Sequence, residues 1–539
     1  MKKSTTLFLL MAMLGVQTLS FAQAPVQEVS GYITSNTTWT KENIYLLSGF
    51  VYVTNGATLT IEPGTLIKGD KFSKGALIIA RGAKLIADGT ADEPIVFTSN
   101  GPTGFRTYGD WGGIILLGKA SINQAGGEAI IEGGVDDGQG NGTYGGGTSP
   151  DDNDNSGVLR YVRIEFPGIA FAPNNEINGL TCGGVGRGTV LEHIQVSYSG
   201  DDSYEFFGGT VNAKYLIAFR GLDDDFDTDN GYSGKLQFLY SLRDPNIADI
   251  SGSNGFESDN DATGSTNTPV THALFSNVTI AGPKVTSSSA FNASYKRGAH
   301  LRRNTQTCIY NSILMGYPSG IMVDGAASET NATADLLQVR NTVLSGCASS
   351  FEVASGSAFD ISGWFNTAAY ANTVYTANTD VMLTDPFNLA APNALPAAGS
   401  PVLSGAAFSV TNLTDPFFEV VNFRGAFGTT DWTLGWANWT PNNSGYTSVS
   451  EPNTISGINI YPNPMSDNAT LELNLQEANM VNIAITDLSG RMISEVLNEQ
   501  LAAGYHNISI QAPNLATGLY FLQVRSGYDN QVIKLTVAR

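Results

Sequence analysis

One short pattern, a strand of five or six residues that ends at glycine, recurs through the middle of this chain. The copies are Val162–Gly168, Ile194–Gly200, Leu216–Gly221, Asn277–Gly282, Asn311–Gly316 and Asn341–Gly346. They lie roughly 20 to 35 residues apart, a period typical of solenoids. Such a unit is too short for a strand–helix–strand repeat but holds three short strands and their turns. The pattern therefore predicts an all-β fold, a right-handed parallel β-helix over residues 25–440.

The clearest internal repeat predicts which residues are neighbours. Asp201–Glu205 aligns with Asp223–Asp227 at an offset of 22 residues. If this offset is one coil, Asp202 and Asp224 lie side by side on parallel strands, about 4.8 Å apart. A helical repeat would show a 3.6-residue period, and none is visible here. A propeller would need blades of about 40 residues or more, which suits the spacing poorly.

The same repeat predicts positions for two smaller groups. Val190 and Val211 each follow a Gly-Thr pair, so both are expected to face the core. Asn277, Asn311 and Asn341 each open one copy of the strand pattern. We expect these three asparagines to form a turn ladder, with side-chain amides stacked from coil to coil. Their predicted role is structural.

Residues 201–261 hold most of the candidate chemistry, because acidic side chains gather there. The candidate metal ligands are Asp201, Asp202, Glu205, Asp223, Asp224, Asp225, Asp227 and Asp229. Two carboxylates one coil apart repel by ~3 kcal/mol at an effective dielectric near 20. A hard cation with oxygen ligands, such as calcium, would offset this repulsion. An EF-hand is excluded, because Leu236 occupies the position of its twelfth, acidic ligand.

A second interpretation of these acids stays open. Asp and Asn are favoured in turns for their own backbone hydrogen bonds, so the acids would then be solvated turn residues. Asp151–Gly157 is a weaker candidate for a cation loop, and a flexible polar loop accounts for it better. The sequence favours neither calcium binding nor solvated turns for residues 201–229.

The last part of the chain shows strand patterning with a different spacing. Apolar and polar residues alternate, as in Leu471–Leu475, which predicts about seven short strands in a small β-sandwich. Its landmarks are, in order, Tyr461–Pro464, Asp487–Arg491, Leu515–Tyr520 and Lys534–Arg539. Residues 455–539 thus closely resemble the type A C-terminal sorting domain of the type IX secretion system, after a polar linker at 441–454. The resemblance implies the type IX secretion machinery as a partner.

The first residues have the layout of a secretory signal. Lys2 and Lys3 precede the apolar run Leu7–Val16, and small residues follow up to Ala22. We expect cleavage after Ala22, so that residues 1–22 form the signal peptide. A membrane anchor is the alternative, but the run is shorter than the ~20 residues that cross a bilayer. The mature protein is therefore expected to have no transmembrane anchor and to be secreted or held at the outer cell surface.

The central region resembles the right-handed β-helix proteins that often accompany type IX sorting domains. Hydrolases of this fold that resemble polygalacturonases place catalytic aspartates on adjacent coils, as Asp201 and Asp223 would be. However, the Asn-Thr-Asp, Gly-His-Gly and Arg-Ile-Lys motifs of that family are absent. A lyase would pair bound calcium with a basic residue from Lys296–Arg303. That segment is expected to lie roughly four coils away, or ~19 Å, which counts against a shared sugar site.

The tryptophan-rich segment before the linker has two interpretations. Phe423–Phe427 and the residues through Trp439 are expected to close the C-terminal end of the solenoid, because the apolar cross-section must be covered. Alternatively, Trp432, Trp436 and Trp439 form a platform on which sugars stack. The cap is the favoured interpretation.

Composition fits an extracellular cargo protein. A formal net charge of −21 excludes nucleic acid as a partner, because phosphates need a basic face. Three cysteines, Cys182, Cys308 and Cys347, lack metal-ligand spacing, which favours buried thiols and leaves a Cys308–Cys347 bridge open. We therefore expect a surface or secreted β-helix that binds surface polysaccharide or an extracellular glycan, or acts in adhesion. The alternative is a lyase or glycoside hydrolase for acidic polysaccharide.

Overall fold

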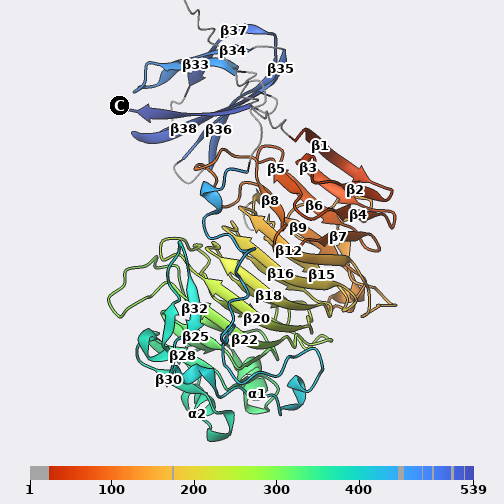
Figure 1. Cartoon of the computed structure of the whole chain (residues 1–539), viewed down its shortest axis with the longest axis vertical. Helices are drawn as coiled ribbons and strands as arrows, with labels where there is room; N and C mark the ends of the chain where they lie inside the picture. Colours follow the sequence, from red (N-terminus) through yellow and green to blue (C-terminus); the bar gives the residue numbers. More distant parts are fainter. Residues whose placement is uncertain are drawn as a thin grey trace, which may run out of the picture.

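The computed structural model describes residues 24–172, 175–446, 455–475, 478–487, 491–511, 515–526 and 529–539. The predicted signal peptide and residues 447–454 of the predicted linker lie outside this range. A long parallel β-solenoid is followed by a small β-sandwich, which lies beyond the first coils in Figure 1. The predicted fold class is confirmed. Among the described residues, no helix is long and apolar enough to cross a membrane.

The solenoid is built from short strands that pair in parallel with the next coil. Its first strands are β1 (Val26–Ile33), β2 (Thr37–Trp39), β3 (Ile44–Val53), β4 (Thr58–Ile61), β5 (Leu66–Gly69), β6 (Ala76–Ile79), β7 (Lys84–Asp88), β8 (Ile95–Ser99) and β9 (Ile114–Leu117). The middle strands are β12 (Gly157–Glu165), β15 (Leu180–Gly183), β16 (Val190–Ser197), β17 (Tyr204–Phe207), β18 (Asn212–Phe219), β19 (Phe226–Asp229), β20 (Lys235–Leu242), β21 (Phe256–Ser258) and β22 (Leu274–Ala281). The last are β23 (Arg297–Leu301), β24 (Cys308–Tyr310), β25 (Ile313–Met315), β26 (Ser319–Val323), β27 (Gln338–Arg340), β28 (Val343–Ser345), β29 (Ser349–Val353) and β30 (Thr373–Tyr375).

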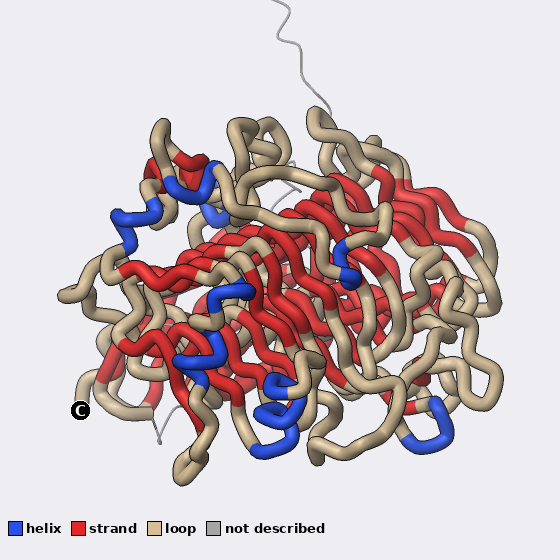
Figure 2. Tube along the Cα trace, turned by 90° about the horizontal axis from the view of Figure 1, so that it is seen from below, coloured by secondary structure: helices blue, strands red, loops and turns tan. Residues whose placement is uncertain are grey.

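Smaller elements decorate the solenoid without interrupting its coils. They are the strands β10 (Ala129–Ile130), β11 (Thr143–Tyr144), β13 (Ala170–Ala172), β14 (Asn175–Glu176), β31 (Leu383–Asp385) and β32 (Asn393–Pro396), with the helices α1 (Ala326–Thr333) and α2 (Ile361–Phe365). Figure 2 shows successive coils stacked along the axis, with helical turns at the periphery. Ile361, Trp364 and Phe365 of α2 join the main hydrophobic core, so this helix covers the last coils.

Columns of buried apolar side chains, one from each coil, hold the coils together. Ile194, Leu216, Leu239 and Val278 occupy matching register positions on β16, β18, β20 and β22, and all four are fully buried. Burying each such side chain contributes about 1.5–3 kcal/mol. The repeating glycine-terminated strand pattern is therefore the sequence signature of this inward column and its turn.

The neighbours predicted from the 22-residue repeat are only partly correct. Glu205 pairs with Asp227 in parallel register, and the Ser203 amide donates to the Asp224 carbonyl, so this offset is one coil. Val211 is buried in the core, as predicted. Val190 pairs with Asn212 and is only half-buried. The prediction for Val190 is wrong. Residues paired on β16 and β18 are 22 positions apart, whereas Val190 and Val211 are only 21 apart, so the two valines do not occupy the same register position.

One turn position is left-handed in coil after coil. It is occupied by Tyr161, His193, Tyr215, Phe238, Asn277, Asn311 and Asn341, with φ between 49° and 61°. Asparagine tolerates this conformation better than most residues. The predicted asparagine column is thus present, but its amides do not bond to one another. Those of Asn277, Asn311 and Asn341 donate to the carbonyls of Phe423, Ala407 and Gly405.

These carbonyls belong to residues 401–446, which we call the strap. The strap returns along the side of the solenoid, from Arg424 near β30 to the contact of Asn442 with Arg106 (Figure 1). The predicted end cap at Phe423–Trp439 is therefore wrong, because this segment lies along the flank. Trp436 is 1% exposed and packs edge-on against Tyr161, so it offers no sugar platform.

The C-terminal strands form two antiparallel sheets with a shared core. One contains β33 (Ile455–Tyr461), β34 (Asn468–Leu475) and β37 (Gly504–Gln511), and the other β36 (Met492–Leu501), β35 (Asn479–Thr486), β38 (Gly518–Ser526) and β39 (Asp529–Val537). Leu471, Leu473 and Leu475 are buried, as their alternation predicts. An ion pair between Arg525 and the buried Asp70 joins this sandwich to the first coils.

All three cysteines are free thiols. Cys182 and Cys308 are fully buried, and Cys347 is partly buried. Burial raises the pKa of the Cys308 thiol to about 11, which keeps it protonated and unreactive. The disulfide between Cys308 and Cys347, left open by the sequence, is not formed.

Candidate functional site

One face of the solenoid carries a column of ionisable side chains. We call the surface formed by β17, β19, β21, β23 and their flanking turns the polar face. Glu205, Asp227, Glu257 and His300 follow one another there, each in register with the next. Side chains at one register position of a parallel ladder point the same way, about 4.8 Å apart. Three carboxylates and an imidazole therefore form one outward column.

A second row lies just before these strands. The Asp224 amide donates to Oδ1 of Asp202 at 2.7 Å, and the Asn254 amide donates to Oδ1 of Asp224. Each aspartate carboxylate thus accepts a hydrogen bond from a backbone amide of the next coil. Asp202 and Asp224 are 8% and 4% exposed, so little water reaches them.

Together the two rows create three groups of oxygen ligands. In each group the ligand atoms lie within 4.8 Å of one another. The groups are Asp201, Asp202 and Asp223; Asp202, Glu205 and Asp227; and Asp224, Asp227 and Glu257. Carboxylate oxygens at these separations suit a hard divalent cation. Clusters of acidic residues that could hold a metal ion are therefore present, and nothing in their geometry identifies calcium.

The electrostatics show why these acids need a counter-charge. Burial, followed by repulsion from neighbouring carboxylates, raises the pKa of Asp202, Glu205, Asp224 and Asp227 well above the usual range. Burial likewise raises the pKa of Asp223 to about 6. Ionising the whole cluster in the absence of a cation is therefore unfavourable.

Several buried oxygens at the polar face have no hydrogen-bond donor. Among the described residues, Oδ1 of Asp223 and Oδ1 of Asp227 are buried without a partner. The same holds for Oδ1 of Asn178 and Oδ1 of Asn254, whose side chains are 1% exposed. A buried acceptor without a donor costs about 1–3 kcal/mol. Coordination of a cation would satisfy such oxygens, so the residues present fit one.

The structure sorts the sequence-predicted residues into three groups. Asp201, Asp202, Glu205, Asp223, Asp224 and Asp227 come together at the polar face. Asp229 lies at the edge, where burial and the charge of Asp259 raise its pKa to about 7. Asp225 points inward and pairs with the fully buried Arg243 at 2.7 Å. Its carboxylate is therefore not available to the cluster.

Sequence reasoning did not assign Glu257, Asn178 or Asn254 to the site. Asn178 donates to both Glu132 and Glu205, and Asn254 donates to Glu257. The acid-rich segment contains Glu257, but its partner Asp227 lies 30 residues earlier instead of 22. Only the strand register reveals that these residues share a column.

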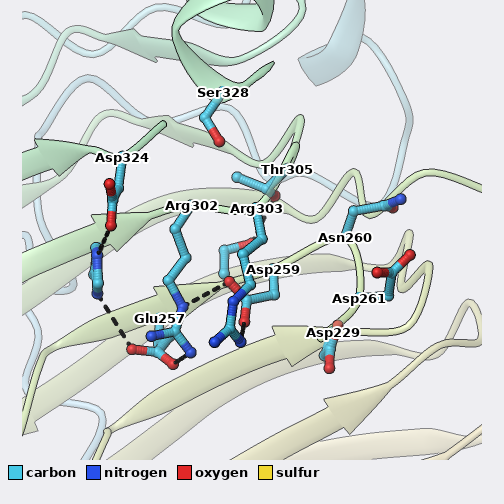
Figure 3. Close-up of polar contacts among 12 residues, drawn as sticks. Asp229, Glu257, Asp259, Asn260, Asp261, Arg302, Arg303, Thr305, Asp324 and Ser328 are labelled. Atoms are coloured by element: carbon cyan, nitrogen blue, oxygen red, sulfur yellow. Dashed lines mark hydrogen bonds and ion pairs between the residues drawn. The ribbon is translucent and has the colours of Figure 1, made fainter. Parts of the chain in front are cut away.

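Basic residues adjoin the acids directly, as Figure 3 shows. The guanidinium of Arg302 pairs with Glu257 and donates from Nε to Oδ1 of Asp259 at 2.7 Å. Arg303 donates to Oδ2 of the same aspartate at 2.6 Å. The expected four-coil separation of Lys296–Arg303 from the acids is therefore wrong. Long inserted loops enlarge the later coils, so β23 lies next to β21 and two coils from β19.

His300 lies between two carboxylates. Its Nδ1 is 3.3 Å from Oε2 of Glu257, and its Nε2 is 3.0 Å from Oδ2 of Asp324. Burial would raise the pKa of Glu257, but the hydrogen bond from His300 and the charge of Arg302 outweigh it, so this pKa is lowered. Glu257 therefore favours the ionised form, whereas the raised pKa values of Asp224 and Asp227 favour their protonated forms.

The weaker candidate loop, Asp151–Gly157, has a structural role. Asp152 accepts the Ser121 amide at 2.9 Å, and Asp154 accepts the Lys119 amide at 3.1 Å. These carboxylates tie the loop to the neighbouring coil, which supports the interpretation as a polar loop.

Comparisons with known proteins agree with this architecture. Residues 31–384 match the family described as "Pectate-lyase like beta helix domain", and residues 459–538 match the "Secretion system C-terminal sorting domain". The latter shows a secreted or cell-surface protein handled by the type IX system. No curated protein matches the chain.

One solved structure with some similarity is tailspike protein 2 from Escherichia coli O157:H7 bacteriophage CAB120. It is 10% identical, with a TM-score of 0.19, and the match covers 92% of this chain. The chain spans 64% of that tailspike's length. At this TM-score the likeness supports no statement about function.

Proposed function

This chain belongs to the pectate-lyase-like β-helix family, and from that premise we propose that it binds an extracellular glycan along its polar face with the help of calcium. The observation that carries the proposal is the set of carboxylates at Asp202, Asp224 and Asp227, together with buried oxygens that lack donors. Calcium takes six to eight oxygen ligands in flexible geometry, which suits this mixture of carboxylate and amide oxygens.

A glycan suits the rest of the polar face. Coils repeated about every 4.8 Å present a long row of polar groups, and an extended chain of sugars can contact several of them at once. Open coordination positions of a bound cation would be filled by hydroxyl or carboxylate oxygens of the sugar. The sorting domain supports this proposal only in that it directs the protein out of the cell, where such glycans occur.

Cleavage of an acidic polysaccharide is the second candidate. It is favoured by the contact of Arg302 with Glu257, which removes the separation expected from the sequence. A lyase needs a base, however. Burial lowers the pKa of Arg302, but the charges of Glu257 and Asp259 outweigh this and raise it above its usual value. The guanidinium is thus suited to holding an anion and not to abstracting a proton.

The test is a polysaccharide panel assayed with the purified secreted protein. We expect retention of one or more glycans in millimolar calcium, loss of retention in chelator, and weaker retention by Asp227→Asn. The exposed Asp92 provides the matched control, Asp92→Asn. New reducing ends or unsaturated sugars in the same samples would establish the enzymatic alternative. Equal binding with calcium and with chelator would contradict a role for the cation.

A further inference from the structure

The C-terminal sandwich meets the solenoid through one face of its larger sheet. On β35 and β38, alternate residues such as Ile485 and Leu522 belong to the core of the sandwich. Thr486, Phe521 and Gln523 occupy the positions between them and therefore point to the other side of the sheet. These three residues line a cavity together with residues of the first coils, and Thr486 is only 1% exposed. The sandwich is thus docked on the solenoid as well as tethered to it by the chain.

An ion pair holds this face in place. The guanidinium of Arg525 pairs with Oδ1 of Asp70, whose side chain is 4% exposed. Asp70 follows β5, and its Oδ2 accepts the Ser73 amide at 3.0 Å and the Ser73 hydroxyl at 2.6 Å. The carboxylate is therefore oriented by its own turn, so that Arg525 meets a preorganised partner.

Most of the docking surface on the solenoid belongs to one loop. Residues 100–110 connect β8 with β9, and we call them the docking loop. Several of them line the cavity beside Phe521. The same loop contacts the end of the strap, because the amides of Gly104 and Arg106 donate to the carbonyl and the side-chain Oδ1 of Asn442, at 2.7 and 3.1 Å. The docking loop is therefore shared by the strap and the sandwich.

The end of the strap is fixed by a buried carboxylate. Oε1 of Glu165, on β12, accepts the side-chain amide of Asn438 at 3.1 Å and the hydroxyl of Tyr446. Glu165 is 1% exposed. Arg106 of the docking loop lies over the Tyr446 ring, 5.3 Å from its centroid, and donates to the Ser444 carbonyl at 3.0 Å. The strap end and the docking loop thus form one bonded unit.

The docking loop needs distant segments to take its shape. Asn442 lies 336 positions after Arg106 in the sequence. The amide of Asp110 donates to the Phe166 carbonyl at 3.0 Å, just after β12. Ordering a loop costs conformational entropy, which such contacts must offset. The surface on which the sandwich docks is therefore complete only when β12 and the strap are both in place.

The interface is suited to reversible docking. It contains a cavity of about 360 Å³, which has room for several water molecules at about 30 Å³ each. Interfaces between domains allow relative motion unless they are large and hydrophobic. The sandwich and the solenoid have separate hydrophobic cores, so each keeps its own core when they part. Two folded units can therefore exchange between a docked and a released arrangement.

We propose that the docking loop couples the strap to the sorting domain, so that the sorting domain docks only on a solenoid that has folded through to the end of the strap. The partner of this face of the sandwich is the chain's own folded cargo. Docking gives the sorting domain a fixed orientation, in which Tyr505 on the opposite sheet is 88% exposed and accessible to the secretion machinery. A solenoid without its strap leaves the sorting domain unoriented, which lowers export. This inference does not depend on glycan or calcium binding.

Two substitutions should release the sandwich by different routes. Removing one partner of a buried, hydrogen-bonded charge pair changes an equilibrium by tenfold or more, so Arg525→Gln should raise the ratio of released to docked protein at least about tenfold. Asn442→Ala removes the acceptor of the Arg106 amide, and Asn442 does not line the interface cavity. Its effect reaches the sandwich through the docking loop, and it should raise the same ratio roughly 2- to 30-fold.

Distances between spin labels in the purified full chain measure this ratio. Labels attached through Asp92→Cys on the solenoid and Glu499→Cys on the sandwich, both at exposed positions, give one narrow distance when docked and a broad distribution when released. Asn443→Ala is the matched control for the strap, since this neighbouring side chain is exposed. Arg340→Gln is the control for loss of an ion pair, because Arg340 pairs with an aspartate on a late coil. Thermal melts check that each variant is folded.

Surface labelling of cells that produce the same variants tests export. Arg525→Gln and Asn442→Ala should both lower the surface level, and the two controls should match wild type. If Arg525→Gln releases the sandwich and Asn442→Ala does not, the docking loop does not report on the strap, and the proposal is overturned. A broad distance distribution in the wild type overturns it as well. Wild-type export of both released variants would contradict a role of docking in export.

Discussion

The backbone amide of Asp224 donates a hydrogen bond to the carboxylate of Asp202, one coil earlier in the solenoid, at 2.7 Å. This contact fixes two buried aspartates in one row and brings their charges together. In a parallel ladder such pairs recur from coil to coil, because side chains at one register position lie over one another. Acidic residues that are merely frequent in the sequence thus become a concentrated negative charge in the fold.

The first prediction concerns the pH dependence of stability without metal. Burial raises the pKa of Asp223 to about 6 and that of Asp229 to about 7, above the value of about 3.9 in an unfolded chain. The folded state therefore holds more protons, and these groups lower stability as the pH rises from about 4 to 7. Asp223→Asn and Asp229→Asn should each relieve this loss, by roughly 3 and 4 kcal/mol respectively at pH 8.

Denaturant unfolding of wild type and variants, in chelator at pH 4.5 and pH 8, measures the effect. Saturating calcium should remove most of the difference at Asp223, which belongs to one of the ligand groups, because the cation supplies the missing counter-charge. An advantage of the variants that is the same at both pH values would show that titration of these acids is not responsible.

The second prediction concerns calcium and thermal stability. A ligand that binds only the folded state stabilises it by about 2.7 kcal/mol at a hundredfold excess over its dissociation constant. The melting temperature should rise with calcium and fall with chelator, and Asp224→Asn should blunt the response. A melting temperature that is indifferent to millimolar calcium would mean that the acids are solvated turn residues.

The third prediction concerns His193, which is stacked between Tyr161 and Tyr215 with ring centroids 4.4 Å away on each side. Burial lowers its pKa to about 4. The folded state then holds fewer protons than the unfolded state between pH 6.5 and 4, so stability is lost as the pH falls through this window. The loss is at most about 3 kcal/mol.

Replacing His193 by phenylalanine keeps a ring in the stack and removes the titration. The stability difference between wild type and His193→Phe should change between pH 7 and pH 4.5. A pH-independent difference would exclude protonation of His193 as the cause.

The fourth prediction concerns the strap. The side-chain amide of Gln237 donates to the Glu419 carbonyl and accepts the Glu419 amide, both at 2.8 Å. Gln237→Ala removes both bonds, and it should destabilise the protein by roughly 2–4 kcal/mol. Hydrogen exchange should accelerate at residues 415–423. The exposed Gln139 gives the control Gln139→Ala. Unchanged exchange would mean that other contacts hold the strap.

The fifth prediction concerns export. Deleting residues 455–539 removes the whole sandwich, whose core is separate from that of the solenoid. The remaining protein should fold but stay in the periplasm, as fractionation and surface labelling would show. Truncated protein on the cell surface at the wild-type level would contradict this role of the sorting domain.

Some features follow from the sequence because they are local and repeated. The glycine-terminated strands predict a solenoid, since each copy forms the same inward column, as Ile194 and Leu216 do. The alternation of Leu471 and Leu473 likewise predicts a strand with one buried face. The 22-residue offset places Glu205 over Asp227 correctly, because no loop intervenes between those coils.

Only the tertiary structure shows which residues lie side by side when loops of unequal length separate them. Glu257 joins Asp227 after 30 residues, and His300 joins Glu257 after 43, because insertions at the turns leave the ladder register intact. A longer surface loop adds little to the free energy of closure, so coil length varies freely and conceals the register. Asp225 turns inward because it pairs with Arg243, on a later strand. The strap lies over the asparagine column because its backbone carbonyls accept hydrogen bonds from those side chains. Both arrangements depend on contacts between segments that are distant in the sequence. No local pattern carries that information.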